Sequence, residues 1–139
     1  MPAPSPTNRE LEILKLLWRR GRATVREIYD DLRPNEGDLA YTTVLSLLQI
    51  MEQKGLVGHE PSGKAYVYFP RVQRESTLAG LAGGFLDAVF DGAVGEYVAR
   101  ALDSRRPTMD ELEQIEQMIA EAKQRALKRT PSAKKRRTN

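Results

Sequence analysis

Three segments in the first half of the chain repeat apolar residues every three or four positions. Residues 7–20, 24–32 and 41–54 therefore each predict an amphipathic helix with one buried face. The first two segments begin with a Thr-x-x-Glu capping box, at Thr7 and Thr24, which marks the start of a helix. The sequence thus predicts three consecutive helices separated by short breaks.

The pattern changes after the third helix, where residues 56–70 indicate two strands. Apolar and polar residues alternate along Ala65-Tyr66-Val67-Tyr68-Phe69, and the turn-forming run Pro61-Ser62-Gly63-Lys64 precedes them. Two strands are marginal by themselves in water, so this hairpin must pack on the helices. Helix, helix, helix and hairpin is the element order of a winged helix-turn-helix, which we expect over residues 1–72.

The remaining chain predicts helices of a different kind. We expect two helices interrupted near Asp91 and Gly92, and a third that begins at the capping box of Thr108. In the helix that begins at Thr108, apolar residues step by three and four, as in a coiled-coil seam too short to be stable alone. We therefore expect residues 73–129 to form a helical region whose seam packs on the preceding helices or, as a dimerisation region, on their copies in a partner subunit, and residues 130–139 to form a disordered basic tail. The expected interface residues are Leu78, Leu81, Phe85, Val89, Leu112, Ile115 and Ile119.

The composition excludes several kinds of site. The 139 residues include no cysteine and one histidine, so disulfides and thiolate metal sites are excluded. No nucleophile–base pair, phosphate-binding glycine loop or metal-ligand cluster stands out, so we expect no enzyme, no cofactor and no metal. No apolar run approaches the roughly 20 residues of a membrane span, which predicts a cytoplasmic protein with no membrane partner. With 40% hydrophobic and 6% aromatic residues, the expected fold class is mainly α with a small β-hairpin.

Charge is distributed unevenly along the chain. Residues 1–72 carry ten basic and nine acidic groups, and residues 75–122 carry three basic and ten acidic groups. Residues 123–139 carry eight basic groups and no acidic group. A basic end after an acidic segment has two interpretations, a solvated tail or a contact with nucleic acid.

The helix predicted over residues 41–54 has an outward face of short polar side chains. Its apolar residues share one side, which leaves the opposite side to Thr42, Ser46 and Gln49, with Thr43 on the flank. Short hydroxyl and amide groups can approach base edges closely, whereas an ordinary solvated helix carries Lys and Glu there. We expect these four residues to contact bases in the major groove of DNA. A second interpretation is that the two threonines only cap the helix.

Residues around this helix are candidates for contacts with the DNA backbone. Thr24 and Arg26 lie where free N–H groups begin the second helix, and Lys64 occupies the turn of the hairpin. Tyr66 and Tyr68 alternate with Val67, so one face of that strand must be core, and either tyrosine is also interpretable as structural. His59 is interpreted as a surface residue. The expected backbone contacts are Thr24, Arg26, Tyr41, Lys54, Lys64 and Tyr66.

Several blocks of this sequence follow one another in a characteristic order. They are Glu12-Ile13-Leu14-Lys15-Leu16-Leu17-Trp18, Thr24-Val25-Arg26-Glu27-Ile28, Leu39-Ala40-Tyr41-Thr42-Thr43-Val44-Leu45, Lys54-Gly55-Leu56-Val57 and Gly63-Lys64-Ala65-Tyr66-Val67-Tyr68. In these blocks the chain resembles the BlaI/MecI family of penicillinase repressors, which also includes copper-responsive members. The resemblance is strong over about residues 7–70, half of the chain, and concerns only the layout of the C-terminal half.

The resemblance implies a sequence-specific transcriptional repressor that binds a palindromic operator in double-stranded DNA as a homodimer. It also implies that the C-terminal helices form the dimer interface. In the β-lactam branch of the family, a membrane sensor-protease triggers cleavage at an Asn-Phe bond, and in the copper branch a cysteine pair takes up metal. Residues 73–129 contain no Asn and the chain contains no Cys, so the inducer or protease partner stays open.

Two other functions are compatible with the same pattern. A winged-helix module can bind a protein through its third helix and wing, and the nearly balanced charge of residues 1–72 favours this alternative. A nucleoid-associated protein can bind DNA without sequence preference through the basic tail. The polar face of the helix over residues 41–54 favours the repressor. In a dimer, two winged domains and two basic tails would supply the phosphate contacts that the balanced charge of one winged region lacks.

Overall fold

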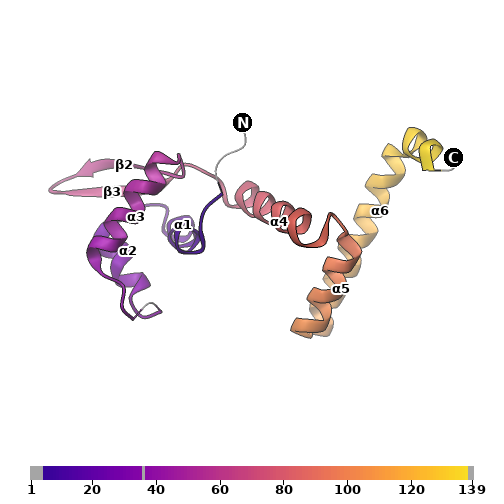
Figure 1. Ribbon diagram of the computed structural model, residues 1–139, viewed down its shortest axis with the longest axis horizontal. Coiled ribbons are helices and arrows are strands. Elements are labelled where there is room, and N and C mark those ends of the chain that lie inside the picture. Colours follow the sequence, from indigo (N-terminus) through magenta and orange to yellow (C-terminus); the bar gives the residue numbers. More distant parts are fainter. Residues whose placement is uncertain (1–4, 36, 138–139) are drawn as a thin grey trace. The chain divides into compact units, whose positions relative to one another are not determined.

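The computed structural model describes residues 5–35 and 37–137, with side chains up to residue 129. Figure 1 shows the helices and strands that these residues form. In chain order they are α1 (Asn8–Arg20), β1 (Ala23–Thr24), α2 (Val25–Leu32), α3 (Tyr41–Gln53), β2 (Val57–Ser62), β3 (Ala65–Pro70), α4 (Arg74–Phe90), α5 (Val94–Arg105) and α6 (Met109–Arg137). The predicted fold class, mainly α with a small β-hairpin, is confirmed.

The helix starts predicted from the sequence are present as reciprocal capping boxes. At the start of α1, Glu10 N donates to Thr7 Oγ1 at 3.2 Å, and Thr7 N donates to Glu10 Oε1 at 2.9 Å. Thr24 and Glu27 form the same pair of bonds at the start of α2, at 3.1 and 2.9 Å. Each box satisfies two N–H groups that a helix end otherwise leaves without partners.

The hairpin predicted from the sequence is part of a three-stranded antiparallel sheet with the order β1-β3-β2. Ser62 pairs with Ala65, so Gly63 and Lys64 form a two-residue turn. Gly63 has a φ of +63°, a conformation that favours glycine at the first position of such a turn. The third strand, β1, has two residues, pairs Ala23 with Tyr68, and is not among the strands expected from the sequence.

The hydrophobic core of the winged region lies between α1, α2, α3 and the sheet. Ile13 and Leu17 of α1, Ile28 of α2 and Leu48 and Met51 of α3 are fully buried in it. These are the positions at which the helical periodicity placed apolar residues. The core therefore confirms the three predicted amphipathic helices and determines which face of each helix points outward.

The chain divides into two compact units, residues 1–89 and 90–139. The pattern of the sequence predicts a boundary after residue 72, whereas α4 groups with the winged region in the structure. The segment before α4 is held there because Trp18 Nε1 donates to Val72 O at 2.9 Å. The interruption predicted near Asp91 and Gly92 is confirmed, and both residues have positive φ.

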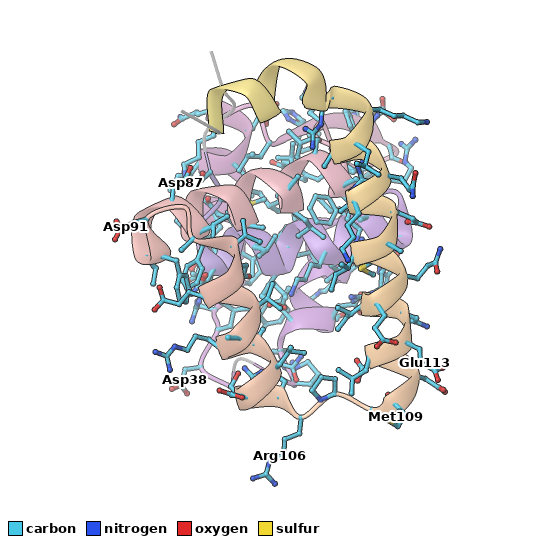
Figure 2. All side chains as sticks on the ribbon, turned by 90° about the vertical axis from the view of Figure 1, so that its right-hand side faces the viewer. Asp38, Asp87, Asp91, Arg106, Met109 and Glu113 are labelled. Atoms are coloured by element: carbon cyan, nitrogen blue, oxygen red, sulfur yellow. The ribbon has the colours of Figure 1, made fainter. Side chains whose placement is uncertain are left out.

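The C-terminal helices differ from the winged region in their exposure. No residue of α4 or α5 is buried in the chain, although both helices are rich in apolar side chains. The helix α5 ends at Arg105, and its C-cap residue Arg106 has a left-handed backbone and a side chain that points outward (Figure 2). Helices with such exposed apolar faces normally pack against another surface.

Helix α6 is longer than its sequence pattern predicts. A disordered tail was expected from residue 130, whereas α6 has helical backbone up to Arg137. The residues from Ala133 to Arg137 have high helix propensity, whereas Pro131 disfavours a helix interior, so propensity alone does not explain the continuation. The last two residues of the expected tail, 138 and 139, lie outside the described residues.

An ion pair between α1 and the end of α3 is the one charged contact that reaches into the described core. Lys54 Nζ lies 2.8 Å from Glu10 Oε1, and the side chain of Glu10 is 3% exposed. Burial by itself raises the pKa of Glu10, but the hydrogen bonds from Lys54 and Thr7 outweigh it, so the pKa lies below its ordinary value of 4.5. The pair therefore contributes to the packing of α3 on α1.

Replacing Lys54 by methionine tests this contribution. We expect Lys54→Met to lower the free energy of unfolding by about 2 kcal/mol at pH 7, because the Glu10 carboxylate loses its charged partner. Urea denaturation measures the loss. Lys15→Met, at an exposed site on α1, is the matched control and should change stability little. Equal losses of stability in the two variants would contradict a stabilising role of the Lys54–Glu10 ion pair.

The same pair predicts how stability depends on pH. Because the pKa of Glu10 is lower in the folded chain, its contribution is present above 4.5 and is lost as the pH falls through the folded pKa. As the pH is lowered below 4.5, we expect the free energy of unfolding to fall less in Glu10→Gln than in the unsubstituted protein. Urea denaturation at a series of pH values measures this difference.

Candidate nucleic-acid interface

The outward face of α3 consists of short polar side chains. Thr42, Thr43, Ser46 and Gln49 are all exposed, whereas Val44 on the opposite side is fully buried. Among the described residues, none of these four side chains forms a hydrogen bond with another protein group. Their donors and acceptors are therefore available to a ligand that approaches α3 from outside.

The two threonines lie inside the helix and do not cap it. The N-cap of α3 is Ala40, which has no side-chain capping bond. Thr43 N donates to Ala40 O at 3.1 Å, so its backbone already belongs to the first turn. The alternative interpretation of Thr42 and Thr43 as caps therefore does not account for them.

A cluster of aromatic and cationic side chains adjoins the first turn of α3. The Arg26 guanidinium lies 5.4 Å from the centre of the Tyr41 ring and 5.8 Å from that of Tyr29. The two tyrosine rings meet edge to face at 5.7 Å. Arg26 also lies 3.9 Å from Asp30, but both side chains are largely exposed, so this ion pair is weak. The rings restrict Arg26 while its charge stays at the surface.

The elements α2, α3 and β3 surround a shallow cavity of about 380 Å³. Five of the six residues expected to contact the DNA backbone line it. They are Thr24, Arg26, Tyr41, Lys64 and Tyr66. These residues are up to 42 positions apart in the sequence, from Thr24 to Tyr66, so the fold brings together groups that the sequence only suggested one by one.

Two members of the expected set have structural partners. Lys54 does not line the cavity, and its ammonium group binds Glu10 instead. The Thr24 hydroxyl accepts from Glu27 N in the capping box of α2. Thr24 therefore contributes to the cavity mainly by setting the start of α2, with its positive dipole end.

The two tyrosines of the wing have different environments. Tyr68 is 5% exposed and belongs to the core, whereas Tyr66 is 57% exposed and lies at the cavity. Burial, together with the nearby Glu52 carboxylate, raises the pKa of Tyr68 above its ordinary value of 10. Tyr68 thus remains a neutral core residue, and Tyr66 is the one whose hydroxyl is accessible.

A contact between β2 and α3, not expected from the sequence, orients the wing. His59 of β2 is exposed, as expected of a surface residue, and its Nδ1 lies 2.7 Å from Glu52 Oε1 of α3. The His59 ring also meets the Tyr66 ring edge to face at 5.0 Å. These contacts link the wing to α3. No periodicity indicates them, because the two residues belong to a strand and a helix.

Other kinds of site have no comparable support. Asp30 and Asp31 point to different partners, since Asp31 accepts from Arg20 at 2.7 Å and Asp30 lies near Arg26. Within residues 5–35 and 37–137, no group of three or more His, Cys, Asp or Glu is arranged to hold a metal ion. None of the helices in this part is alone long and apolar enough to cross a membrane, and only α4 and α5 taken together have the length and hydropathy.

Comparison with known proteins identifies the family. The family model described as penicillinase repressor matches residues 6–121, which is most of the chain. The chain belongs to the penicillinase repressor family. This is a family of transcriptional repressors rather than of enzymes, so the family resemblance noted from the sequence is confirmed.

Individual relatives within the penicillinase repressor family are distant. The penicillinase repressor of Bacillus licheniformis is 23% identical over 122 residues, which is 88% of this chain and 94% of that protein. The transcriptional regulator BlaI of Mycobacterium tuberculosis is 37% identical over 73 residues, 52% of each chain. The solution structure of the DNA-binding domain of the repressor BlaI has a TM-score of 0.48 and 23% identity, and covers 52% of this chain and 88% of that chain.

Proposed function

We propose that this repressor binds a palindromic operator in a sequence-specific manner, as a homodimer. The outward face of α3, with Thr42, Thr43, Ser46 and Gln49 exposed and unbonded, is the observation that carries the proposal. Such a helix fits the major groove, where hydroxyl and amide groups read base edges. Because the N-terminal part of a recognition helix enters the groove deepest, the two threonines and Ser46 are the primary base contacts.

The cavity beside α3 is the proposed binding site for the DNA backbone. Arg26 and Lys64 supply positive charge from two sides of it, and Tyr41 and Tyr66 supply hydroxyl donors. The N-terminus of α2 adds backbone N–H groups and the positive end of its dipole. Lys54 is not among the proposed contacts, because its ammonium group is paired with the Glu10 carboxylate. Phosphate contacts of this kind position the recognition helix on the duplex.

The C-terminal helices support the proposed homodimer. Phe85 and Val89 of α4 are 51% and 55% exposed, and Ile119 of α6 is 49% exposed. The winged region carries nearly equal numbers of positive and negative charges, so a single copy has little general attraction for DNA. Two copies on a palindrome double the base and phosphate contacts. Since its target is DNA, the proposal places the protein in the cytoplasm.

Single substitutions on α3 test the base-reading role. Selection of bound fragments from genomic DNA provides the operator for this test. We expect Thr43→Ala or Ser46→Ala to weaken operator binding by about 1–3 kcal/mol per lost base contact, and to leave binding to random duplex DNA unchanged. Gel-shift titration measures both affinities. An equal loss on the two DNAs would contradict base reading, and a protein-binding module would select no operator at all.

Lys64 tests the backbone role of the cavity. We expect Lys64→Ala to weaken binding to operator and random DNA alike, because a phosphate contact carries no sequence information. The slope of log K against log salt should fall by about 2 in magnitude, one phosphate for each subunit of the dimer. Lys15→Ala, whose side chain lies outside this cavity, is the matched control. An unchanged salt dependence in Lys64→Ala would exclude the contact.

Placing a charge in the exposed apolar face of α6 tests the dimer. We expect Ile119→Lys to shift the full chain towards monomer in analytical ultracentrifugation, because the buried ammonium group would lack a partner. Glu121→Lys, two residues away on a different side of the helix, is the control for the change in charge. A dimer of unchanged stability in Ile119→Lys would remove this face from the interface.

A further inference from the structure

The charges of α6 are segregated along its length. Every charged residue from Asp110 to Glu121 is acidic, and every charged residue from Lys123 to Arg129 is basic. The helix dipole favours this order of signs only in the first and last turns, whereas the segregation continues through the middle of the helix. Among the described side chains of α6, no acidic group forms an ion pair with a basic one. The segregation thus has no explanation within a single helix.

One side of α6 is apolar and incompletely covered. We call Leu112, Ile115, Ile119, Ala122 and Ala126 the α6 seam, because their steps of three and four place them along one side. Leu112 and Ile115 are half-buried, and Ile119 is 49% exposed. A surface of this kind is buried in a stable protein by packing against a second surface.

We propose that the α6 helices of two copies of this chain pair in antiparallel orientation, each covering the seam of the other. In this orientation the acidic half of each helix faces the basic half of the other. In a parallel pair, acidic groups would face acidic groups and basic groups would face basic groups over the whole length. The inference rests on the proposed homodimer and adds the relative direction of its subunits.

The charged residues beside the seam favour the same antiparallel direction as the segregation of charge along α6. With Leu112 at position a of a heptad, Glu116 and Lys123 both occupy position e, and Glu111 occupies position g. Positions e of two antiparallel helices adjoin each other, so Glu116 meets Lys123 of the second copy twice. In a parallel pair, position e adjoins position g, so Glu116 would meet Glu111 twice. The apolar seam permits either direction, and these flanking charges select one.

Distances between spin labels test the direction. Because the chain has no cysteine, a nitroxide can be attached at one place at a time through Glu113→Cys, Ala120→Cys or Leu127→Cys in the full-length protein. All three positions are exposed and are one heptad apart on one side of α6, and Figure 2 shows Glu113 projecting outward near its start. Their labels therefore report direction without entering the seam.

The two directions predict different sets of distances. An antiparallel pair centred on the seam gives a short distance for position 120, and an axial separation of about 20 Å for positions 113 and 127. Equal short distances at all three positions would overturn the inference, as would an absence of coupling in a protein that sediments as a dimer. A monomeric chain would instead contradict the proposed homodimer itself.

Charge substitutions provide a second readout whose sign depends on the direction. In the antiparallel pair, Glu116→Lys faces Lys123, and we expect the dimer Kd to rise about tenfold. The double variant Glu116→Lys/Lys123→Glu should restore it. In a parallel pair, Glu116→Lys would face Glu111 and strengthen the dimer, which would overturn the inference. Glu121→Lys, at position c away from the seam, is the control and should leave the Kd unchanged.

Discussion

The rotation of α3 about its own axis is the constraint on which the proposed DNA-binding surface depends. Val44, Leu48 and Met51 are fully buried against the other helices and the sheet, so α3 cannot turn without exposing them. Burying such side chains stabilises the fold by about 1.5–3 kcal/mol each. Because this side is held inside, Thr42 and Ser46 must face outward. The chemistry of the surface is thus a consequence of core packing.

The same packing positions the surroundings of α3. The core residue Tyr68 anchors β3, and the contact of His59 with Glu52 ties the wing to α3. Arg26 is restricted by the rings of Tyr29 and Tyr41 at the edge of the cavity. A backbone-binding surface needs few charges when they are held in place in this way, since less side-chain freedom is lost on binding. In the proposed homodimer, pairing through the C-terminal helices doubles these contacts.

Periodicity predicted most of the fold and did not predict the pairwise contacts. The capping boxes, the α3 core stripe and the hairpin turn are local patterns, and all are present in the structure. The Lys54–Glu10 pair joins residues 44 positions apart, and β1 has only two residues, so neither leaves a periodic signal. The candidate site was predicted residue by residue, but its common cavity and the different partner of Lys54 required the three-dimensional arrangement.

Hydroxyl-radical footprinting on the operator recovered from genomic DNA tests the central claim most directly, because it shows how α3 is presented to the duplex. If a symmetric dimer presents two α3 helices to the DNA, we expect two protected half-sites related by a dyad. Their centres should lie about 10 base pairs, or a multiple of that, apart. The centre of each half-site should coincide with the bases at which Ser46→Ala loses discrimination. Uniform protection without a dyad, or a single protected patch, would contradict recognition by a pair of α3 helices.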